Sequence, residues 1–223
     1  MKVLAWNILA DEFVEEKYYK DILEMLNRKQ RKKNILKILN DTNADIMLLQ
    51  EVMRSEYNSF SSEYHMILSK NVKWQGKQSY TKNVILLRKS FTINSTILLE
   101  FGVGVHCLYM NKPLLIFSIH LDDLSHSLRM KQISSLLDIV NSCGEIDVII
   151  GGDFNEIYSS TLYKKLKDFN ILNNKPTYLM DSTCIDNIIT KGIHFKVHVD
   201  TITDYKKQMI ECGSDHLPVI AKN

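Results

Sequence analysis

The strongest constraint on how this chain can fold is a set of short apolar runs that each end at a polar residue. The polar residues at these junctions are Asn7, Glu51, His120 and Asp153, each at or just beyond the C-terminal end of a strand-like run. Loops at strand ends of an α/β sheet can converge on a ligand without disturbing the core. We therefore expect these polar residues to lie at a ligand-binding edge.

The spacing of apolar residues predicts both helices and strands. The predicted helices are Gln30–Leu39 and Arg129–Val140, where apolar residues recur at helical spacing. The predicted strands are Met1–Trp6, Asp45–Leu49, Asn83–Leu87, Pro113–Ile119, Asp147–Ile150, Phe195–Val199 and Leu217–Ala221. Strands and helices alternate in places and strand follows strand elsewhere, which indicates a layered α/β fold with at least one mixed sheet.

Length and composition suit an ordinary globular domain. The chain has 223 residues with 3 prolines and 8 glycines, and it has no low-complexity linker or internal repeat, so we expect one domain over residues 1–223. Lysine and arginine number 28 against 26 acidic residues, for a net charge of +2. This balance does not identify a nucleic-acid binder, because attraction to phosphate would have to come from local patches.

The cysteines and the apolar content bear on location. Cys107, Cys143, Cys184 and Cys212 form no C-x-x-C pair, so we expect reduced thiols and no structural zinc site. No stretch approaches the ~20 apolar residues that a membrane span needs, and the N-terminus has no signal-peptide pattern. We expect a cytoplasmic or nuclear protein that does not bind membranes.

Six ordered motifs extend the argument across almost the whole chain. They are Trp6-Asn7-Ile8-Leu9, Leu49-Gln50-Glu51-Val52, Ser118-Ile119-His120-Leu121, Gly151-Gly152-Asp153-Phe154-Asn155, Ile185-Asp186-Asn187-Ile188 and Gly213-Ser214-Asp215-His216-Leu217-Pro218. Each alone has an ordinary explanation as a turn or a helix cap. In this order they resemble the endonuclease/exonuclease/phosphatase family. The resemblance implies a four-layer α/β/β/α sandwich of two packed mixed sheets, with the site at one end.

The resemblance also implies hydrolysis of phosphate esters with a bound divalent metal. A hard cation held by oxygen ligands can neutralise and polarise a phosphodiester. Glu51 is the first candidate for the metal ligand, and Asn7 and Asp215 would complete or support the site. Mg²⁺ keeps several waters, so this sparse set of ligands is expected, and Mn²⁺ could replace it.

The remaining family positions supply candidate catalytic groups. Asp153, after a glycine pair that lets backbones approach closely, would orient or deprotonate the attacking water. Asn155 would hold that water or a phosphate oxygen. His216 and His120 would donate hydrogen bonds to the phosphoryl oxygens, and Asp186 would fix the tautomer of the His216 ring.

The branch of the family is open at this point. The hydrophobic pair after Asn7 is similar to nocturnin-like members and deadenylases, which favours an RNA or oligonucleotide phosphodiesterase of the deadenylase or 2′-phosphodiesterase type. Arg129-Met130 and Gln132 are similar to tyrosyl-DNA phosphodiesterases, although Phe154 departs from their pattern. The alternatives are therefore a DNA-end processing or apurinic-endonuclease-like enzyme, or an inactive nucleic-acid-binding relic. The intact set of motif residues argues against the relic.

The candidate substrate contacts are Arg129, Trp74 and Tyr80, and none of them lies in the six motifs. Trp74 and Tyr80 are surrounded by Lys70, Lys73, Lys77 and Lys82. Basic side chains interleaved with aromatics suit single-stranded nucleic acid, and a solvated loop is the equal alternative. The basic run from Arg28 to Lys33 is interpreted as an exposed helix face. We expect a monomer whose partners are an RNA, oligonucleotide or nucleotide substrate and a targeting protein.

Overall fold

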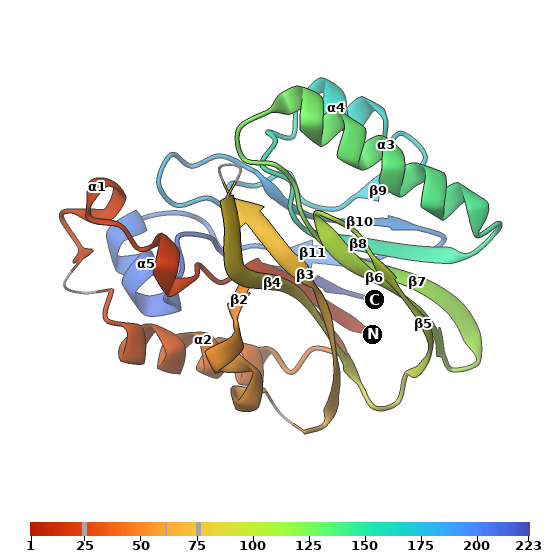
Figure 1. Cartoon of the computed structure of the whole chain (residues 1–223), viewed down its shortest axis with the longest axis horizontal. Coiled ribbons are helices and arrows are strands. Elements are labelled where there is room, and N and C mark those ends of the chain that lie inside the picture. The colour runs from red at the N-terminus through yellow and green to blue at the C-terminus, as the bar shows by residue number, and fades with distance from the viewer. Residues whose placement is uncertain (24–25, 61, 75–76) are drawn as a thin grey trace.

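The computed structural model describes the backbone of residues 1–23, 26–60, 62–74 and 77–223, and their side chains except those of residues 72–74, 77 and 78. Two six-stranded sheets form its centre, and helices lie outside them (Figure 1). The N- and C-terminal ends lie side by side, with the Asn223 amide donating to the Met1 carbonyl at 3.1 Å.

The first sheet has the strand order β11-β12-β1-β2-β4-β3. Its strands, in that order, are β11 (Lys196–His198), β12 (Val219–Lys222), β1 (Lys2–Asn7), β2 (Ile46–Met53), β4 (Lys77–Arg88) and β3 (Tyr64–Trp74). β1 and β2 are parallel and the other neighbours are antiparallel, so the sheet is mixed. Asn7 pairs in register with Gln50, which brings the end of β1 beside Glu51.

The second sheet has the order β5-β6-β7-β8-β10-β9. Its strands are β5 (Thr92–Leu98), β6 (Gly102–Tyr109), β7 (Lys112–His120), β8 (Asp147–Asp153), β10 (Asp186–Lys191) and β9 (Asn170–Ile171). Here β7 and β8 are parallel and the other neighbours are antiparallel. Each sheet therefore has a parallel strand pair at its centre.

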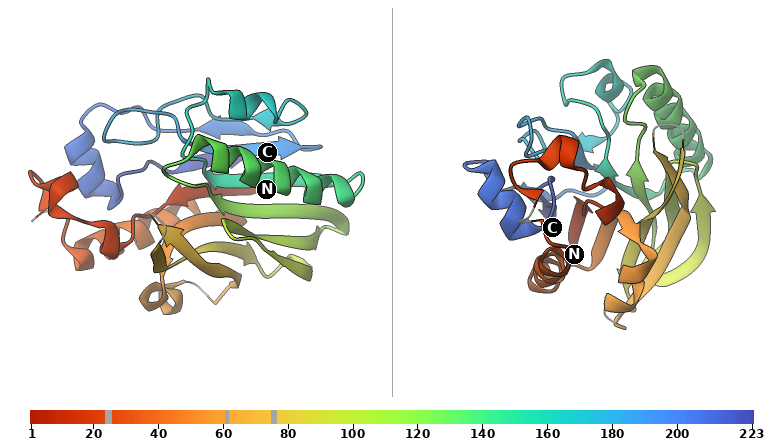
Figure 2. Two further views of the ribbon diagram at one scale, coloured as in Figure 1. Left: turned by 45° about the horizontal axis from the view of Figure 1, so that its top comes forward. Right: turned by 60° about the vertical axis from the view of Figure 1, so that its left-hand side comes forward.

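The helices complete four layers (Figures 1 and 2). Helices α2 (Arg28–Thr42) and α5 (Tyr205–Cys212) lie on the first sheet, and α3 (His126–Ser142) and α4 (Thr161–Lys164) on the second. In α3, Ile133 and Leu136 pack against Phe117 of β7 in one apolar cluster. The predicted α/β/β/α sandwich of two mixed sheets is confirmed.

Local sequence accounts for where the long helices begin and end. The Asn27 side chain accepts from the Lys29 and Gln30 amides at the start of α2, and Asn43 ends the helix in a left-handed conformation. The Ser125 side chain caps α3. Both predicted helices and all the predicted strands are present, with ends shifted by a few residues.

The segment between β1 and α2 contains a 3-10 turn at Asp11–Phe13 and the short helix α1 (Glu16–Tyr19). A second 3-10 segment, Arg54–Ser59, follows β2. All four cysteines are free thiols, as predicted. None of the helices in the described residues has the length and apolar character required to cross a bilayer.

Candidate active site

The polar ends of the central strands surround one cleft of about 300 Å³. Its lining includes Asn7, Glu51, His120, Asp153, Asn155, Asp215 and His216, together with the aromatic side chains of Phe13, Tyr18, Tyr19 and Tyr178. Asp186 lies behind His216 and contacts its ring. The structure thus gathers all the predicted catalytic and metal-binding residues at one place.

Three of these residues lie on one rung of the second sheet. His120 at the end of β7 pairs in register with Asp153 of β8, and Asp153 pairs with Asp186 of β10. Residues on one rung present their side chains to the same face of a sheet. The backbone ladder therefore sets the spacing of this part of the site.

The glycine pair before Asp153 lets β8 approach its neighbours closely. A Cβ on Gly151 would lie 2.6 Å from Leu48 Cδ1 of the facing sheet. Gly152 has φ of +146°, and a Cβ there would lie 1.9 Å from the Ile119 carbonyl oxygen. Only glycine fits at Gly152. This close packing agrees with the expectation that the glycine pair lets two backbones approach beside Asp153.

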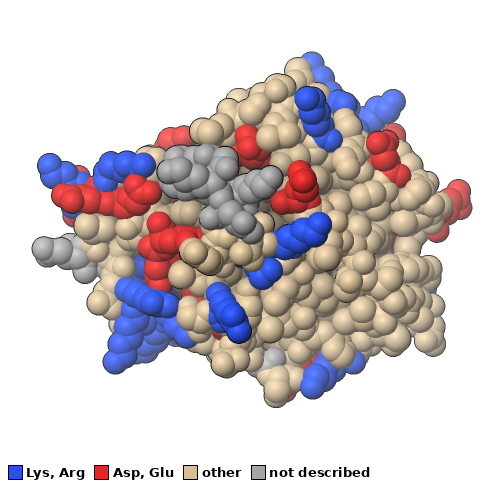
Figure 3. All heavy atoms as spheres, in the orientation of Figure 1, with Lys and Arg blue, Asp and Glu red and all other residues tan. Residues whose placement is uncertain are grey.

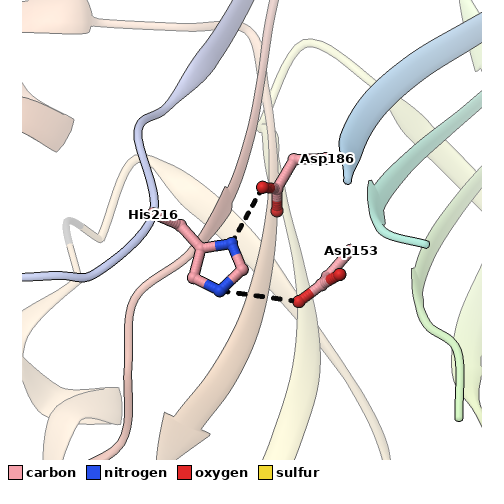
Figure 4. A group of neighbouring side chains, drawn as sticks. All are labelled: Asp153, Asp186 and His216. Atoms are coloured by element: carbon pink, nitrogen blue, oxygen red, sulfur yellow. Dashed lines mark hydrogen bonds and ion pairs between the residues drawn. The ribbon is translucent and has the colours of Figure 1, made fainter. Parts of the chain in front are cut away.

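Asp186, His216 and Asp153 form a connected line of side chains (Figure 4). His216 Nδ1 lies 2.8 Å from Asp186 Oδ2, within hydrogen-bond distance. His216 Nε2 lies 3.8 Å from Asp153 Oδ2. The Asp186 bond fixes the ring so that Nε2 points toward Asp153 and the cleft.

The charge around His216 favours its protonated form. Burial alone would lower the pKa of the imidazole, but the carboxylates of Asp186, Asp215 and Asp153 outweigh it and hold the pKa well above its ordinary value. The Tyr178 ring lies against the imidazole with 5.0 Å between ring centroids. His216 can therefore present a charged N–H donor to an anion in the cleft.

Glu51 is held at a bulge in β2, where the pairing with β4 shifts register between Leu49 and Val52. Its φ of 61° is left-handed, which is uncommon for a residue other than glycine. Its carboxylate accepts from Asn7 Nδ2 at 2.8 Å and from the Ala10 amide at 2.9 Å. Burial raises the pKa of Glu51, and a positively charged partner would stabilise its ionised form.

Asp215 has one satisfied and one unsatisfied carboxylate oxygen. Oδ2 accepts from the Tyr19 hydroxyl at 2.7 Å. Oδ1 is buried and has no hydrogen-bond partner among the described residues, and it lies 3.9 Å from His216 Nε2. Buried polar atoms in native proteins nearly always have a partner, so this oxygen is a candidate ligand atom.

These side chains fit a hard divalent cation. Among the described residues, one group of carboxylate and imidazole side chains brings its ligand atoms within 4.8 Å of one another: Asp153, Asp186 and His216. The His216 ring in that group is already bonded to Asp186, and hard cations prefer oxygen ligands. The buried Glu51 carboxylate and the unpartnered Asp215 Oδ1 suit the cation better.

His120 and Asn155 flank Asp153. His120 Nε2 lies 3.6 Å from Asp153 Oδ2, and its buried Nδ1 has no hydrogen-bond partner in the part of the chain that the structure describes. The Asn155 amide donates to Asp153 Oδ1 at 2.8 Å, and Asn155 Nδ2 donates to the Leu121 carbonyl at 3.0 Å. Asn7 Nδ2 donates to Asp153 Oδ2 at 3.1 Å. The Asp153 carboxylate is therefore held from both sides.

The predicted substrate contacts lie apart from the cleft or outside the described side chains. Arg129 is buried on α3, where Nε donates to Glu156 and Nη1 to the Asp122 carbonyl, both at 2.8 Å. Tyr80 is 78% exposed on β4, and its amide donates to Glu12. The Trp74 side chain lies outside the described part of the chain. The substrate-binding roles of all three stay predictions.

Two residues that touch the site were not found from the sequence. Tyr19 contacts Asp215 directly, although no motif includes it. Arg31 is buried, which contradicts the prediction that the whole basic run faces solvent. The helical spacing of Arg31 with the apolar Ile35 and Leu39, which are also buried, could have indicated this.

Comparison with known proteins identifies the class. Residues 4–216 match the model of the Endonuclease/Exonuclease/phosphatase family, and the chain belongs to that family. Its members are hydrolases that act on phosphoester bonds. The predicted family resemblance is therefore confirmed. No curated protein sequence matches the chain.

Solved structures show the same fold. ANGEL2, described as a 2′,3′-cyclic phosphatase, has a TM-score of 0.81 at 15% identity, covering 99% of this chain and 93% of that chain. The human nocturnin catalytic domain with bound sulfate has a TM-score of 0.74 at 19% identity, with coverage of 99% and 93%. Truncated TDP2 from Caenorhabditis elegans has a TM-score of 0.72 at 18% identity, with coverage of 99% and 96%.

Proposed function

We propose that the chain is a divalent-metal-dependent phosphodiesterase that hydrolyses phosphodiester bonds in RNA or oligonucleotides, with Mg²⁺ as the metal and Mn²⁺ as its substitute. One observation carries the proposal: a single cleft combines buried oxygen atoms that can bind a metal with a carboxylate that faces a buried imidazole. That combination supplies a metal site, a base and an anion donor within one small volume.

The metal would be held by Glu51 and Asp215, with Asn7 in support. When bound, Mg²⁺ would neutralise charge on the phosphate and polarise it toward attack. Asn7 Nδ2 and the Ala10 amide hold the two oxygens of Glu51, which orients the carboxylate before any ion arrives. Tyr19 holds Asp215 Oδ2 in the same way and leaves Oδ1 available.

Asp153 would orient the attacking water and take its proton. The Asn155 amide and the Asn7 side chain fix the two oxygens of this carboxylate. A base held in this way needs little reorganisation when the water attacks. The spread of hydrogen bonds also keeps the carboxylate turned toward the cleft.

His216 would stabilise charge on the phosphoryl oxygens. Asp186 fixes the ring by its contact with Nδ1, so the Nε2 proton points into the cleft. Donors placed where negative charge develops stabilise the transition state more than the ground state. His120, on the other side of Asp153, would donate from Nε2 to a second oxygen.

The substrate class draws on the relatives. ANGEL2 has also been solved in complex with adenosine-2′,3′-vanadate, at a TM-score of 0.81 and 16% identity. The binding of an adenosine vanadate to that protein supports a ribonucleotide substrate here. As part of the same proposal, the enzyme acts as a monomer in the cytoplasm or nucleus, and its own loops or a targeting protein select the substrate.

A substrate panel with Mg²⁺ or Mn²⁺ tests the proposal. It contains 3′-5′ RNA, 2′-5′ oligoadenylate, abasic DNA and 5′-tyrosyl DNA. We expect cleavage of at least one RNA substrate, loss of activity after chelation, and recovery when Mg²⁺ is restored. Cleavage of the DNA substrates alone would replace the RNA assignment with DNA-end processing. Full activity after exhaustive chelation would rule out the metal-dependent mechanism.

A further inference from the structure

Helix α2 begins with a basic run, but one arginine in it faces inward. Basic side chains gather at the lower left of the molecule, over α2 (Figure 3). Lys29 and Lys33 are exposed there, and the Arg28 side chain is 61% exposed. The Arg31 side chain is only 3% exposed. A buried guanidinium is costly unless it is fully paired, so its contacts indicate why it is there.

The Arg31 guanidinium bonds to the two loops that carry Asn7 and Asp215. Nε donates to the Gly213 carbonyl at 2.8 Å. Nη2 donates to the Ile8 carbonyl at 3.2 Å and also to the Leu9 carbonyl. Ile8 and Leu9 directly follow Asn7, and Gly213 precedes Asp215 by two residues. One side chain thus joins the loop before Asp215 to the loop after Asn7, and Asn7 in turn holds the Glu51 carboxylate.

Asp11 neutralises the buried charge. Arg31 Nη1 lies 2.5 Å from Asp11 Oδ1, and Arg28 Nε lies 2.6 Å from Asp11 Oδ2. Arg28 therefore shares the same carboxylate but is mostly exposed to solvent. The two arginines form a natural pair for comparison, because they have the same chemistry and the same acid.

The loops that Arg31 holds have unusual backbone conformations. Leu9 has φ of 53°, in the left-handed region, and its amide donates to Asn7 Oδ1 at 3.1 Å. Gly213 has φ of 83°, and a Cβ there would lie 2.9 Å from the Arg31 carbonyl oxygen. A left-handed conformation at a residue other than glycine, as at Leu9, persists only where the surroundings fix it. The Arg31 guanidinium, which donates to the Leu9 carbonyl, contributes to that fixation, and the Arg31 backbone packs closely against Gly213.

Arg31 itself does not line the cleft, so it cannot bind substrate there. Its influence would have to pass through Asn7 and Asp215. Displacement of a catalytic group by about 1 Å can cost on the order of 100-fold in rate. A residue that sets the separation of two ligand-bearing loops can therefore control both metal affinity and rate.

We propose that Arg31 is a positioning residue, which holds the Asn7 loop and the Asp215 loop at the separation that the metal requires. The proposal rests on the proposed metal-dependent function. Lysine cannot replace arginine here, because an ammonium group cannot match four acceptors arranged around a planar fork. The same bonds would be lost even though the charge is kept.

The test compares Arg31→Lys with Arg28→Lys. Mn²⁺ binding is measured by titration calorimetry without substrate, and kcat and KM are measured on the best substrate. For Arg31→Lys we expect the Mn²⁺ Kd to rise about 10- to 100-fold, the range for losing a group that orients a ligand. The rate should fall at low Mn²⁺ and partly recover with excess Mn²⁺. Arg28→Lys should match the wild type within about twofold, because the Arg28 side chain is 61% exposed and exposed ion pairs contribute little.

A folded Arg31→Lys protein with wild-type Mn²⁺ affinity and kcat would overturn the positioning role, and so would an equal loss in Arg28→Lys. If Arg31→Lys does not fold, Gly213→Ala pushes the same loop away from α2, and it should weaken Mn²⁺ binding. Wild-type affinity in folded Gly213→Ala would also overturn the proposal. Failure of the wild-type protein to bind Mn²⁺ would instead contradict the metal site itself.

Discussion

The two halves of the active site are built in different ways. The second sheet contributes His120, Asp153 and Asp186, which share one rung of a regular backbone ladder. The first sheet contributes Glu51 at a bulge, and Asp215 comes from the loop before β12. A regular backbone ladder positions the first group, whereas irregular backbone together with side-chain contacts positions the second.

This difference separates two kinds of failure. A side-chain change on the rung should remove a chemical function and leave its neighbours in place, because the backbone sets the spacing. A change among the side-chain contacts of the first sheet should displace the candidate metal ligands and lower the affinity for the metal. The first defect should persist at any metal concentration, and the second should be relieved by excess metal.

The largest expected effect is on the rung. Asp153→Asn keeps the size of the side chain but removes its basicity. We expect kcat to fall by a factor on the order of 10²–10⁴, the usual scale for a general base. KM should change little, and excess Mg²⁺ should not restore the rate. Steady-state kinetics on the purified variant check this.

Asp147→Asn, at the opposite end of β8, is the matched control for that variant. It should retain wild-type kinetics, since Asp147 is not among the described residues that line the cleft. An Asp153→Asn protein that is folded by circular dichroism and turns over close to the wild-type rate would remove Asp153 from the mechanism. Asp153 would then have only a structural role at the end of β8.

Tyr19→Phe should give the opposite kinetic behaviour. It removes only the hydroxyl that donates to Asp215 Oδ2 at 2.7 Å. We expect the apparent Mg²⁺ affinity to fall about tenfold, the low end for losing such a contact. The rate at saturating Mg²⁺ should recover. Tyr64→Phe is the control, because it loses an equally short hydroxyl bond to the Ala44 carbonyl. If excess Mg²⁺ did not restore the rate of Tyr19→Phe, the expected difference between the rung residues and the metal-ligand contacts would be wrong.

Tyr80→Ala addresses the rim of the first sheet, where no metal contact is involved. If the exposed ring stacks on a base, its loss should cost about 1 kcal/mol, or roughly fivefold in KM for a single-stranded oligonucleotide. Hydrolysis of a small diester without bases should be unaffected. Trp74→Ala should act in the same direction. Unchanged KM for every single-stranded substrate would show that neither side chain contributes to substrate binding.

The smallest expected effect is at Glu156, which follows β8 and accepts from His126 and Arg129. Burial opposes ionisation, but these two contacts outweigh it and lower the pKa of Glu156 below its ordinary value of 4.5. The ion pair therefore stabilises the fold above that value. This contribution should disappear as pH falls through the lower folded pKa.

Glu156→Gln should lower the melting temperature at pH 7 by about 2–4 °C for each kcal/mol that the pair contributes, because it leaves the buried Arg129 guanidinium without its acidic partner. The gap to the wild type should close in acid, and kcat should stay near the wild-type value. The exposed Glu145→Gln is the control. A gap that stays constant from pH 7 to pH 3, measured by thermal unfolding, would show that ionisation of Glu156 contributes nothing.

The strands that the sequence predicted are the ones whose apolar character is continuous. The central strands β2, β7 and β8 are buried along most of their length, so they read as unbroken apolar runs. Strand β5 escaped detection because most of its residues are exposed and polar. Strand β6 contains Gly102 and Gly104, which predict a turn by local rules. The structure needs Gly104 because a Cβ there would lie 2.4 Å from the Phe117 ring.

The site divides in the same way. The residues at strand ends could be predicted because their types and order carry the chemistry. Helical spacing could indicate that Arg31 is buried, but the contacts of Tyr19 and Arg31 could not be predicted, because they include partners 196 and 182 residues away along the chain. No local pattern distinguishes a tyrosine bonded to a ligand from one that faces solvent. Such positioning contacts become visible only in three dimensions.

The shared rung of His120, Asp153 and Asp186 makes activity a measure of folding accuracy. A slip of β8 by one residue against β7 would turn Asp153 to the opposite face of the sheet, because side chains alternate along a strand. A slip in the direction that places Asp153 at the Gly152 position would also bring a Cβ against the Ile119 carbonyl. Chains with a misaligned sheet should therefore be inactive even when compact. Specific activity after refolding would then report the fraction of molecules in which these strands have aligned correctly.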